Sequence, residues 1–180
     1  AFSIVAMTRS ILIGVRDPLG IRPLVLGKLK DAYVLSSETC GLDIIGAKFV
    51  REVEPGEMVV VAQGRVDSHR PFEPVRPRPC IFEYVYFSRP DSIIGGKSVY
   101  EVRREIGKQL AIEAPVEADM VCPVPDSGTP AAIGFAQQSG IPFEMGIVRN
   151  QYVGRTFIEP TAQIRDMGVR LKLNVNRSLM

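Results

Sequence analysis

The sequence predicts a mixed α/β fold in which a β-rich first part is followed by a second part with a parallel α/β sheet. Three observations carry this prediction. Short β-branched and apolar runs recur through residues 1–62, four prolines crowd residues 71–79, and strand and helix patterns alternate after them. The 180-residue chain is 46% hydrophobic and 23% charged, an ordinary soluble composition with room for one or two domains.

The first part contains strand patterns separated by turn residues. Glu54-Pro55-Gly56 and Gln63-Gly64-Arg65 each place a glycine in a short polar turn, which favours hairpins over a βαβ repeat. The expected strands cover residues 1–7, 10–16, 32–36 and 57–62.

Residues 71–79 form the expected boundary between the two parts. Pro71, Pro74, Pro77 and Pro79 remove backbone donors and favour an extended conformation, so this stretch predicts a linker. We therefore expect one domain at residues 1–79 and a second at residues 80–180.

The second part changes to a helical period. Ser98 and Glu101 form a capping box ahead of apolar residues at helical spacing, and Ser139-Gly140 ends another helix. Strand, helix and strand in succession favour a parallel sheet. We expect helices at 98–113 and 130–138, and strands at 81–87, 119–124 and 142–148.

Composition excludes several classes of function. A net charge of +2 gives no argument for nucleic-acid or membrane binding, and no apolar run is long enough for a transmembrane helix. Three widely spaced cysteines fit a reducing cytoplasm better than a disulfide framework. The single histidine, His69, lies in a polar run and is expected to be solvated, so a histidine triad cannot be built from this chain.

Two loops carry the candidate chemistry. Asp126-Ser127-Gly128-Thr129 stands between an expected strand and an expected helix, where free N–H groups and the positive end of the dipole accept phosphate. The alternative is an ordinary helix N-cap, since Asp, Ser and Thr are preferred there. Arg149–Phe157 follows a strand, and its arginines, with Gly154, favour a lid over a polyanion. The alternative for this loop is a solvated basic surface.

The chain resembles the glutamine phosphoribosylpyrophosphate amidotransferase family in an ordered set of motifs. RDPLGIRPL (16–24) and SETC (37–40) resemble the later strands of the glutaminase domain of class II amidotransferases. CIFEYVYFSRPDS (80–92) resembles the signature that opens the phosphoribosyltransferase domain, and PVPDSGT (123–129) and YVGRTFI (152–158) continue it. Salvage phosphoribosyltransferases lack the RDPLGIRPL and CIFEYVYFSRPDS blocks.

The resemblance implies an internal piece of a longer enzyme: the C-terminal part of an Ntn-type glutaminase domain, then the first half of a type I phosphoribosyltransferase domain. The activity it implies is the first committed step of purine synthesis, in which an N-terminal cysteine hydrolyses glutamine and ammonia displaces pyrophosphate from phosphoribosyl pyrophosphate. It also implies purine nucleotide inhibitors, a homo-oligomer (a tetramer) and a cytoplasmic location.

Site residues follow from the matching positions. Ser127 corresponds to the family's Mg²⁺-associated serine, and Cys80 to a position that supplies one thiolate in members with a [4Fe–4S] cluster. The substrate-binding residues implied by the resemblance are Asp126, Ser127, Gly128, Thr129, Arg149, Asn150, Tyr152 and Arg155.

Departures from the family pattern motivate a second hypothesis. Residue 1 is Ala, the acidic phosphoribosyl-binding motif is absent, and Gln151 stands where the family often has Arg. No catalytic residue can therefore be assigned within this sequence, which is expected to be inactive by itself. The alternative function is a non-catalytic phosphate- or nucleotide-binding module.

Overall fold

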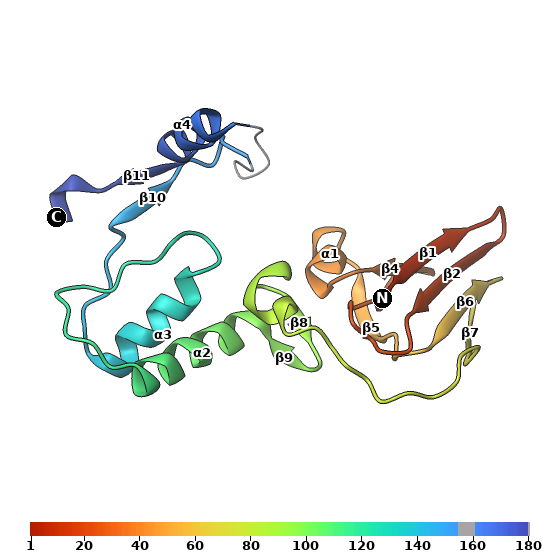
Figure 1. Ribbon diagram of the computed structural model, residues 1–180. Helices are drawn as coiled ribbons and strands as arrows, with labels where there is room; N and C mark the ends of the chain where they lie inside the picture. Colours follow the sequence, from red (N-terminus) through yellow and green to blue (C-terminus); the bar gives the residue numbers. More distant parts are fainter. Residues whose placement is uncertain (155–160, 180) are drawn as a thin grey trace. The chain divides into compact units, whose positions relative to one another are not determined.

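The computed structural model describes residues 1–154 and 161–179, which form two compact units, Ala1–Tyr100 and Glu101–Met180 (Figure 1). Residues 80–100 belong to the first of these compact units. The domain boundary expected at residues 79/80 stays a prediction. No helix among the described residues has both the length and the apolar character needed to cross a membrane.

Antiparallel pairing dominates the first unit. One sheet has the order β1-β2-β6-β7, a second has the order β4-β3-β5, and β8 and β9 form a hairpin. The elements are β1 (Ser3–Met7), β2 (Ile11–Arg16), β3 (Val25–Leu29), β4 (Ala32–Ser36), α1 (Thr39–Ile44), β5 (Lys48–Glu52), β6 (Met58–Ala62), β7 (Arg65–His69), the π-helix η1 (Glu83–Phe87), β8 (Ile93–Ile94) and β9 (Lys97–Ser98).

Strand β3 carries the core of this unit because it is buried on both faces. Leu26 packs with Val53 and Val59 on one face, and Val25 packs with Leu42 of α1 on the other. Alternation of side chains along a strand sends Leu26 and Val25 to opposite faces. A short apolar segment thereby joins both sheets and α1.

The expected strands of the first part are confirmed. The strand at 32–36 has the expected bounds, and those at 10–16 and 57–62 begin one residue later than expected. Gln63 (φ 50°) and Gly64 (φ 74°) form the hairpin turn between β6 and β7. The elements β3, β5, β7 and α1 were not predicted from the sequence.

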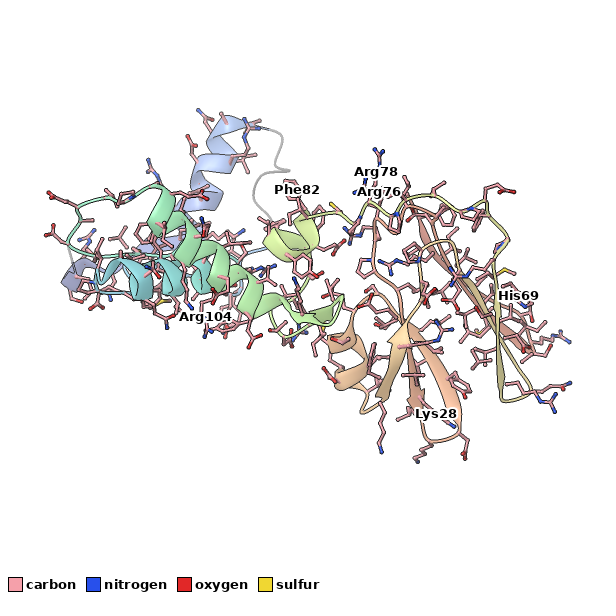
Figure 2. All side chains as sticks on the ribbon, turned by 90° about the horizontal axis from the view of Figure 1, so that it is seen from below. Lys28, His69, Arg76, Arg78, Phe82 and Arg104 are labelled. Atoms are coloured by element: carbon pink, nitrogen blue, oxygen red, sulfur yellow. The ribbon has the colours of Figure 1, made fainter. Side chains whose placement is uncertain are left out.

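The proline-rich stretch is extended and exposed, as expected for a linker, and it carries Arg76 and Arg78 (Figure 2). His69 is exposed as expected, although it ends strand β7 rather than lying in a loop (Figure 2). Gly95 and Gly96 form the turn of the β8–β9 hairpin, with φ of 55° and 73°.

The strand expected at residues 81–87 is wrong, because this segment forms the π-helix η1. Glu83 N donates to the carbonyl of Cys80, which starts a turn, and the buried Glu83 carboxylate accepts the Ser88 hydroxyl at 2.7 Å. Phe82 and Phe87 stack at 5.9 Å between ring centroids. The alternating aromatic residues therefore predicted a strand. The segment instead forms a helical turn that contains the buried Glu83 carboxylate.

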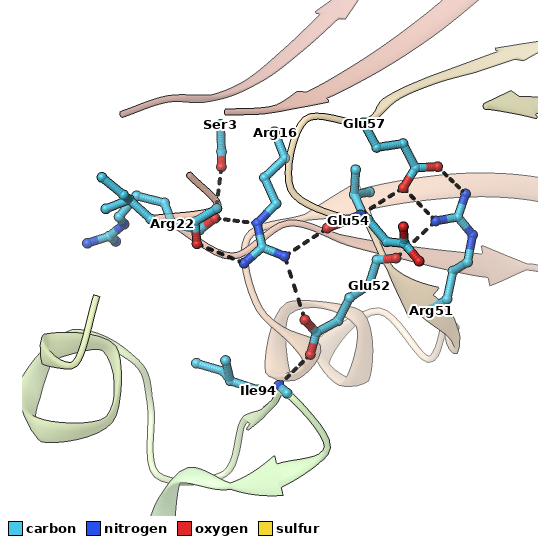
Figure 3. A network of polar contacts seen from close by, with 12 residues as sticks. Ser3, Arg16, Arg22, Arg51, Glu52, Glu54, Glu57 and Ile94 are labelled. Atoms are coloured by element: carbon cyan, nitrogen blue, oxygen red, sulfur yellow. Dashed lines mark hydrogen bonds and ion pairs between the residues drawn. The ribbon is translucent and has the colours of Figure 1, made fainter. Parts of the chain in front are cut away.

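A buried guanidinium holds the turns of the first unit together (Figure 3). Arg16 is 6% exposed and donates to the carbonyl oxygens of Arg22 (2.9 Å), Gly20 (3.1 Å) and Val53 (2.8 Å). Its charge faces the Glu52 carboxylate at 3.7 Å. These carbonyls lie outside the sheets, so Arg16 satisfies acceptors that strand pairing leaves open.

Glu57 is the corresponding buried anion (Figure 3). It is 1% exposed and accepts hydrogen bonds from Arg51 (2.7 and 2.8 Å), from the Glu54 backbone N–H (2.7 Å) and from the Ser68 hydroxyl (2.6 Å). Burial alone would raise the pKa of Glu57, but the hydrogen bonds from Arg51 and Ser68 outweigh it and lower the pKa to about 2.

Among its described residues, the second unit contains three α-helices of 11 to 15 residues and a strand pair. An isolated parallel bridge joins Val121 to Phe143, which precede and follow α3 in the sequence. β10 pairs antiparallel with β11. The elements are α2 (Val99–Glu113, which begins in the first unit), α3 (Thr129–Ser139), β10 (Ile147–Arg149), α4 (Ala162–Lys172), β11 (Leu173–Val175) and the short 3₁₀ helix η2 (Arg177–Leu179).

Both helices expected in the second part are confirmed within one residue at each end. Gly140 ends α3 in the left-handed conformation, with φ 76°. The strands expected at 119–124 and 142–148 are largely wrong, since only the single parallel bridge and the start of β10 form there. The Val121–Phe143 bridge keeps the expected order of strand, helix and strand. The helix α4 was not predicted from the sequence.

We predict that Glu57→Gln destabilises the fold by about 2 kcal/mol at neutral pH, because it removes the anion from a buried, hydrogen-bonded pair. The pKa of Glu57 is lowered in the folded protein, so its contribution is full above the ordinary value of 4.5 and is lost as pH falls toward about 2. Denaturant unfolding from pH 7 downward measures this. The difference between wild type and variant should shrink below pH 4.5. The exposed Glu54→Gln is the control, and a pH-independent difference would contradict the assignment.

Candidate functional site

The polar side chains of the loop before α3 do not cap the helix: Asp126 is exposed, and Ser127 and Thr129 are half-buried. Gly128 is the N-cap residue, and the helix start has no capping hydrogen bond from a side chain. The turn is closed by the backbone, with Gly128 N donating to Val124 O (3.3 Å) and Thr129 N to Asp126 O (3.2 Å). The N-cap interpretation of these polar residues is therefore not supported. Within the described residues, the Ser127 hydroxyl has no hydrogen-bond partner and remains available.

Gly128 is required by the tightness of this loop. A Cβ atom built on Gly128 would lie 2.8 Å from the carbonyl oxygen of Val124, closer than real contacts allow. Its φ of −78° is ordinary, so close approach rather than backbone conformation demands glycine. The same compactness brings Asp126, Ser127 and Thr129 together at the first turn of α3.

The structure joins the two candidate loops through an ion pair. The Arg149 guanidinium, at the end of β10, pairs with the Asp126 carboxylate before α3. Arg149 Nε is buried and has no hydrogen-bond partner among the described residues, so the group keeps an unused donor. Two segments that sequence analysis treated separately therefore meet at one place.

The segment after Arg149 turns toward solvent. The Asn150 side-chain oxygen accepts the Tyr152 backbone N–H at 3.0 Å, and the Tyr152 side chain is 90% exposed. Arg155, also expected in the site, lies outside the described residues. The described part of this loop therefore begins at the ion pair of Arg149 with Asp126 and leaves the Tyr152 ring exposed.

The position of α3 is set by two glycines that sequence analysis did not single out. A Cβ on Gly107 of α2 would lie 1.8 Å from Ala131 O, and a Cβ on Gly134 of α3 would lie 1.9 Å from Arg104 O. The backbones of α2 and α3 therefore touch in both directions. Ala131 is in the first turn of α3, so the contact with Gly107 constrains where the Ser127 loop ends.

The described residues contain no group of three metal ligands. Mg²⁺ commonly uses one or two protein ligands together with substrate phosphates and water, and an open Ser127 hydroxyl fits one such ligand. A [4Fe–4S] cluster requires four thiolates. Cys80 is half-buried with a free thiol, so it fits the part of one ligand, and the described residues form no complete cluster site.

Comparisons with known proteins extend over nearly the whole sequence. No family model matches it. The amidophosphoribosyltransferase of Rhizobium etli is 57% identical over 99% of this chain, and that of Archaeoglobus fulgidus is 49% identical over 98%. A solved structure, glutamine phosphoribosylpyrophosphate amidotransferase from B. subtilis complexed with ADP and GMP, matches 98% of the chain with a TM-score of 0.88 and 48% identity.

The resemblance to the amidophosphoribosyltransferases is confirmed. The expected fold class, a glutaminase-type β-rich part followed by a phosphoribosyltransferase-type α/β part, is confirmed with it. This chain spans only part of the length of its relatives: it covers 37% of the Rhizobium protein and 39% of the B. subtilis protein. The role of each site residue stays a prediction.

We predict that Gly107→Ala destabilises the protein by about 2 kcal/mol and displaces the first turn of α3, because overpacking of a tight contact forces the backbone apart. NMR should show amide shifts at Ser127, Gly128 and Ala131. Gln109→Ala, on the exposed side of the same helix, should change stability by less than about 0.5 kcal/mol. Unchanged amide shifts in a folded Gly107→Ala protein would contradict the positioning role.

Proposed function

We propose that this chain is part of an amidophosphoribosyltransferase that makes 5-phosphoribosylamine from phosphoribosyl pyrophosphate and glutamine. The observation that carries the proposal is the open Ser127 loop at the start of α3, joined through Asp126 to the Arg149 segment. A helix N-terminus, free hydroxyl groups and a guanidinium are the groups that bind a diphosphate. The sequence relatives share this activity by name.

The proposed reaction has two steps, hydrolysis of glutamine and displacement of pyrophosphate by ammonia. Water cleaves the carbon–nitrogen bond of the glutamine carboxamide, which yields glutamate and ammonia. The ammonia nitrogen then bonds to C1 of the activated ribose while the bond from C1 to the pyrophosphate oxygen breaks. Pyrophosphate leaves with the bonding electron pair, and the new ammonium group loses a proton. This proposal assigns the nucleophile of the first step to no residue of this sequence.

The residues of the loop have distinct roles in this proposal. Ser127, Gly128 and Thr129 receive the diphosphate at the start of α3, where the dipole and the hydroxyl groups favour negative charge. The Arg149 guanidinium then pairs with a phosphate oxygen, either in place of the Asp126 carboxylate or in addition to it. Asn150, Tyr152 and Arg155 follow as the covering segment, which excludes water from the departing charge.

Ser127 is the residue that would hold Mg²⁺ through its hydroxyl, and the cation would supply neutralisation of the charge on the leaving group. Cys80 is the residue that would supply this chain's thiolate to a [4Fe–4S] cluster in an enzyme that carries one.

The wider properties are carried over from the family resemblance. We propose purine nucleotides as feedback inhibitors, in keeping with a B. subtilis relative that was solved with ADP and GMP. We also propose a homotetrameric enzyme in the cytoplasm, where three unbridged cysteines remain reduced.

We predict that Ser127→Ala in a complete enzyme carrying this segment lowers kcat/KM for phosphoribosyl pyrophosphate about tenfold, the equivalent of one lost hydrogen bond to a charged group. Steady-state kinetics with ammonium salts measures this without the glutamine step. Ser139→Ala is the matched control, because it removes a hydroxyl at the other end of α3. An unchanged kcat/KM for Ser127→Ala would remove this residue from the site.

We predict that the isolated 180-residue protein forms no 5-phosphoribosylamine from either glutamine or ammonia. The reason is that neither a nucleophilic N-terminal residue nor the acidic motif is present in it. A measurable rate would contradict this. Calorimetry with purine nucleotides tests the alternative of a binding module, which the open loop at α3 favours. Tight binding by the stably folded isolated protein would support that alternative.

A further inference from the structure

The carboxylate of Asp126 takes no part in the fold of its own loop. The turn before α3 is closed by backbone groups, since Thr129 N donates to the Asp126 carbonyl oxygen at 3.2 Å, and no side chain caps the helix. The carboxylate pairs instead with the guanidinium of Arg149, which lies 23 residues later in the sequence. Among the described residues, this guanidinium is its one hydrogen-bond partner. The Asp126 side chain therefore acts on Arg149 rather than on the turn.

The ion pair leaves part of Arg149 unused. The side chain of Arg149 is 34% exposed and that of Asp126 is 69% exposed, so water competes for both partners. Ion pairs between groups of this exposure are weak. The Arg149 Nε is buried and has no acceptor among the described residues. Asp126 thus balances the charge of Arg149 without using all of its donors, and an acceptor with more charge and more oxygens can replace it.

Neither backbone has to move when the partners of Arg149 change. Arg149 ends β10 and lies opposite Leu173 of β11, so strand pairing holds its backbone. The loop of Asp126 is held by the hydrogen bond from Gly128 N to Val124 O at 3.3 Å. Release of Arg149 from Asp126 is therefore a change of side-chain torsions alone.

A polar cavity of about 820 Å³ lies beside Arg149. Arg177 and the side chains of three asparagines also line it, and no acidic residue lines it within the part of the chain that the structure describes. The surroundings of Arg149 on this side thus favour an anion. The carboxylate that opposes an anion at Arg149 comes from the other side, from Asp126.

We propose that Asp126 is an internal competitor of the phosphate ligand: its carboxylate occupies Arg149 in the empty site and lowers the affinity of the site for pyrophosphate. This inference rests on the proposed function, which places a diphosphate at Ser127 and Arg149. It goes further by giving Asp126 an opposing role in place of the binding role that the resemblance implies. Every ligand that uses Arg149 has to displace Asp126. The consequence for the reaction is weaker retention of the pyrophosphate product, which favours its release.

The test uses a complete enzyme carrying this segment, with inorganic pyrophosphate as the probe. Isothermal titration calorimetry at low ionic strength measures the Kd of wild type, Asp126→Asn and Asp126→Ala. We expect both substitutions to lower the Kd about fivefold, the upper range for an ion pair between exposed groups. The gain should fall below about twofold in about 1 M KCl, where charges are screened beyond about 3 Å.

Matched controls separate competition for Arg149 from a general change of charge. Asp126→Glu keeps the carboxylate, and Glu117→Gln removes an exposed negative charge elsewhere in the second unit. Both should bind pyrophosphate with the wild-type Kd within about twofold. With phosphoribosyl pyrophosphate and ammonium salts, Asp126→Asn should lower KM without raising kcat, because the competitor is displaced equally in the ground state and in the transition state.

The outcomes are distinct. An unchanged Kd in folded Asp126→Asn and Asp126→Ala would overturn the proposal, and so would a raised Kd, which would mean that Asp126 binds the ligand. A lowered Kd that persists in 1 M KCl would overturn it too. If thermal melts show that neither variant folds, Asp126 is a structural residue and the proposal is wrong. An unmodified enzyme that neither binds pyrophosphate nor releases it from phosphoribosyl pyrophosphate with ammonium salts would instead refute the proposed function.

Discussion

Burial of charged side chains against unpaired backbone groups is the constraint on which the first unit depends. Its sheets are small, and the segments between them contain many prolines and turns, so many carbonyl and N–H groups have no strand partner. Arg16 binds three carbonyls from two connecting segments, while Glu57 and Glu38 bind backbone N–H groups and hydroxyls. Removing one such partner leaves a buried charge or a buried amide unsatisfied, and either is costly.

The second unit solves a different problem with small residues. Gly107 and Gly134 let two helices touch backbone to backbone, so the first turn of α3 has little room to shift. The Ser127 loop is closed by its own backbone, which leaves hydroxyl groups free for a ligand. Rigid support with free donors is what preorganised binding of a polyanion needs, because little entropy is then lost when the ligand arrives.

Local pattern predicted the elements whose hydrophobic period is clear, notably β4, α2 and α3, and the extended conformation of the proline-rich residues 71–79. It failed where distant contacts decide. In the π-helix η1, Glu83 is buried, which the local sequence did not indicate. In β3, Gly27 and Lys28 interrupt the run of apolar residues that would have predicted a strand. In the candidate site, the Ser127 loop was recognisable from its residue types and place. The ion pair of Asp126 with Arg149 and the hydrogen bonds of Glu38 with Arg89 and Ser92 span 23 to 54 residues, so no local pattern could indicate them.

The pairing of β10 with β11 brings together two positions that are far apart in the sequence. Arg149 lies opposite Leu173, and Asn150 N donates to Lys172 O at 2.7 Å, so both ends of the segment between these strands leave the sheet as neighbours. Strand pairing therefore already holds Arg149 and Leu173 together, so the entropy of bringing these two residues together is lost when the chain folds and not when a ligand binds.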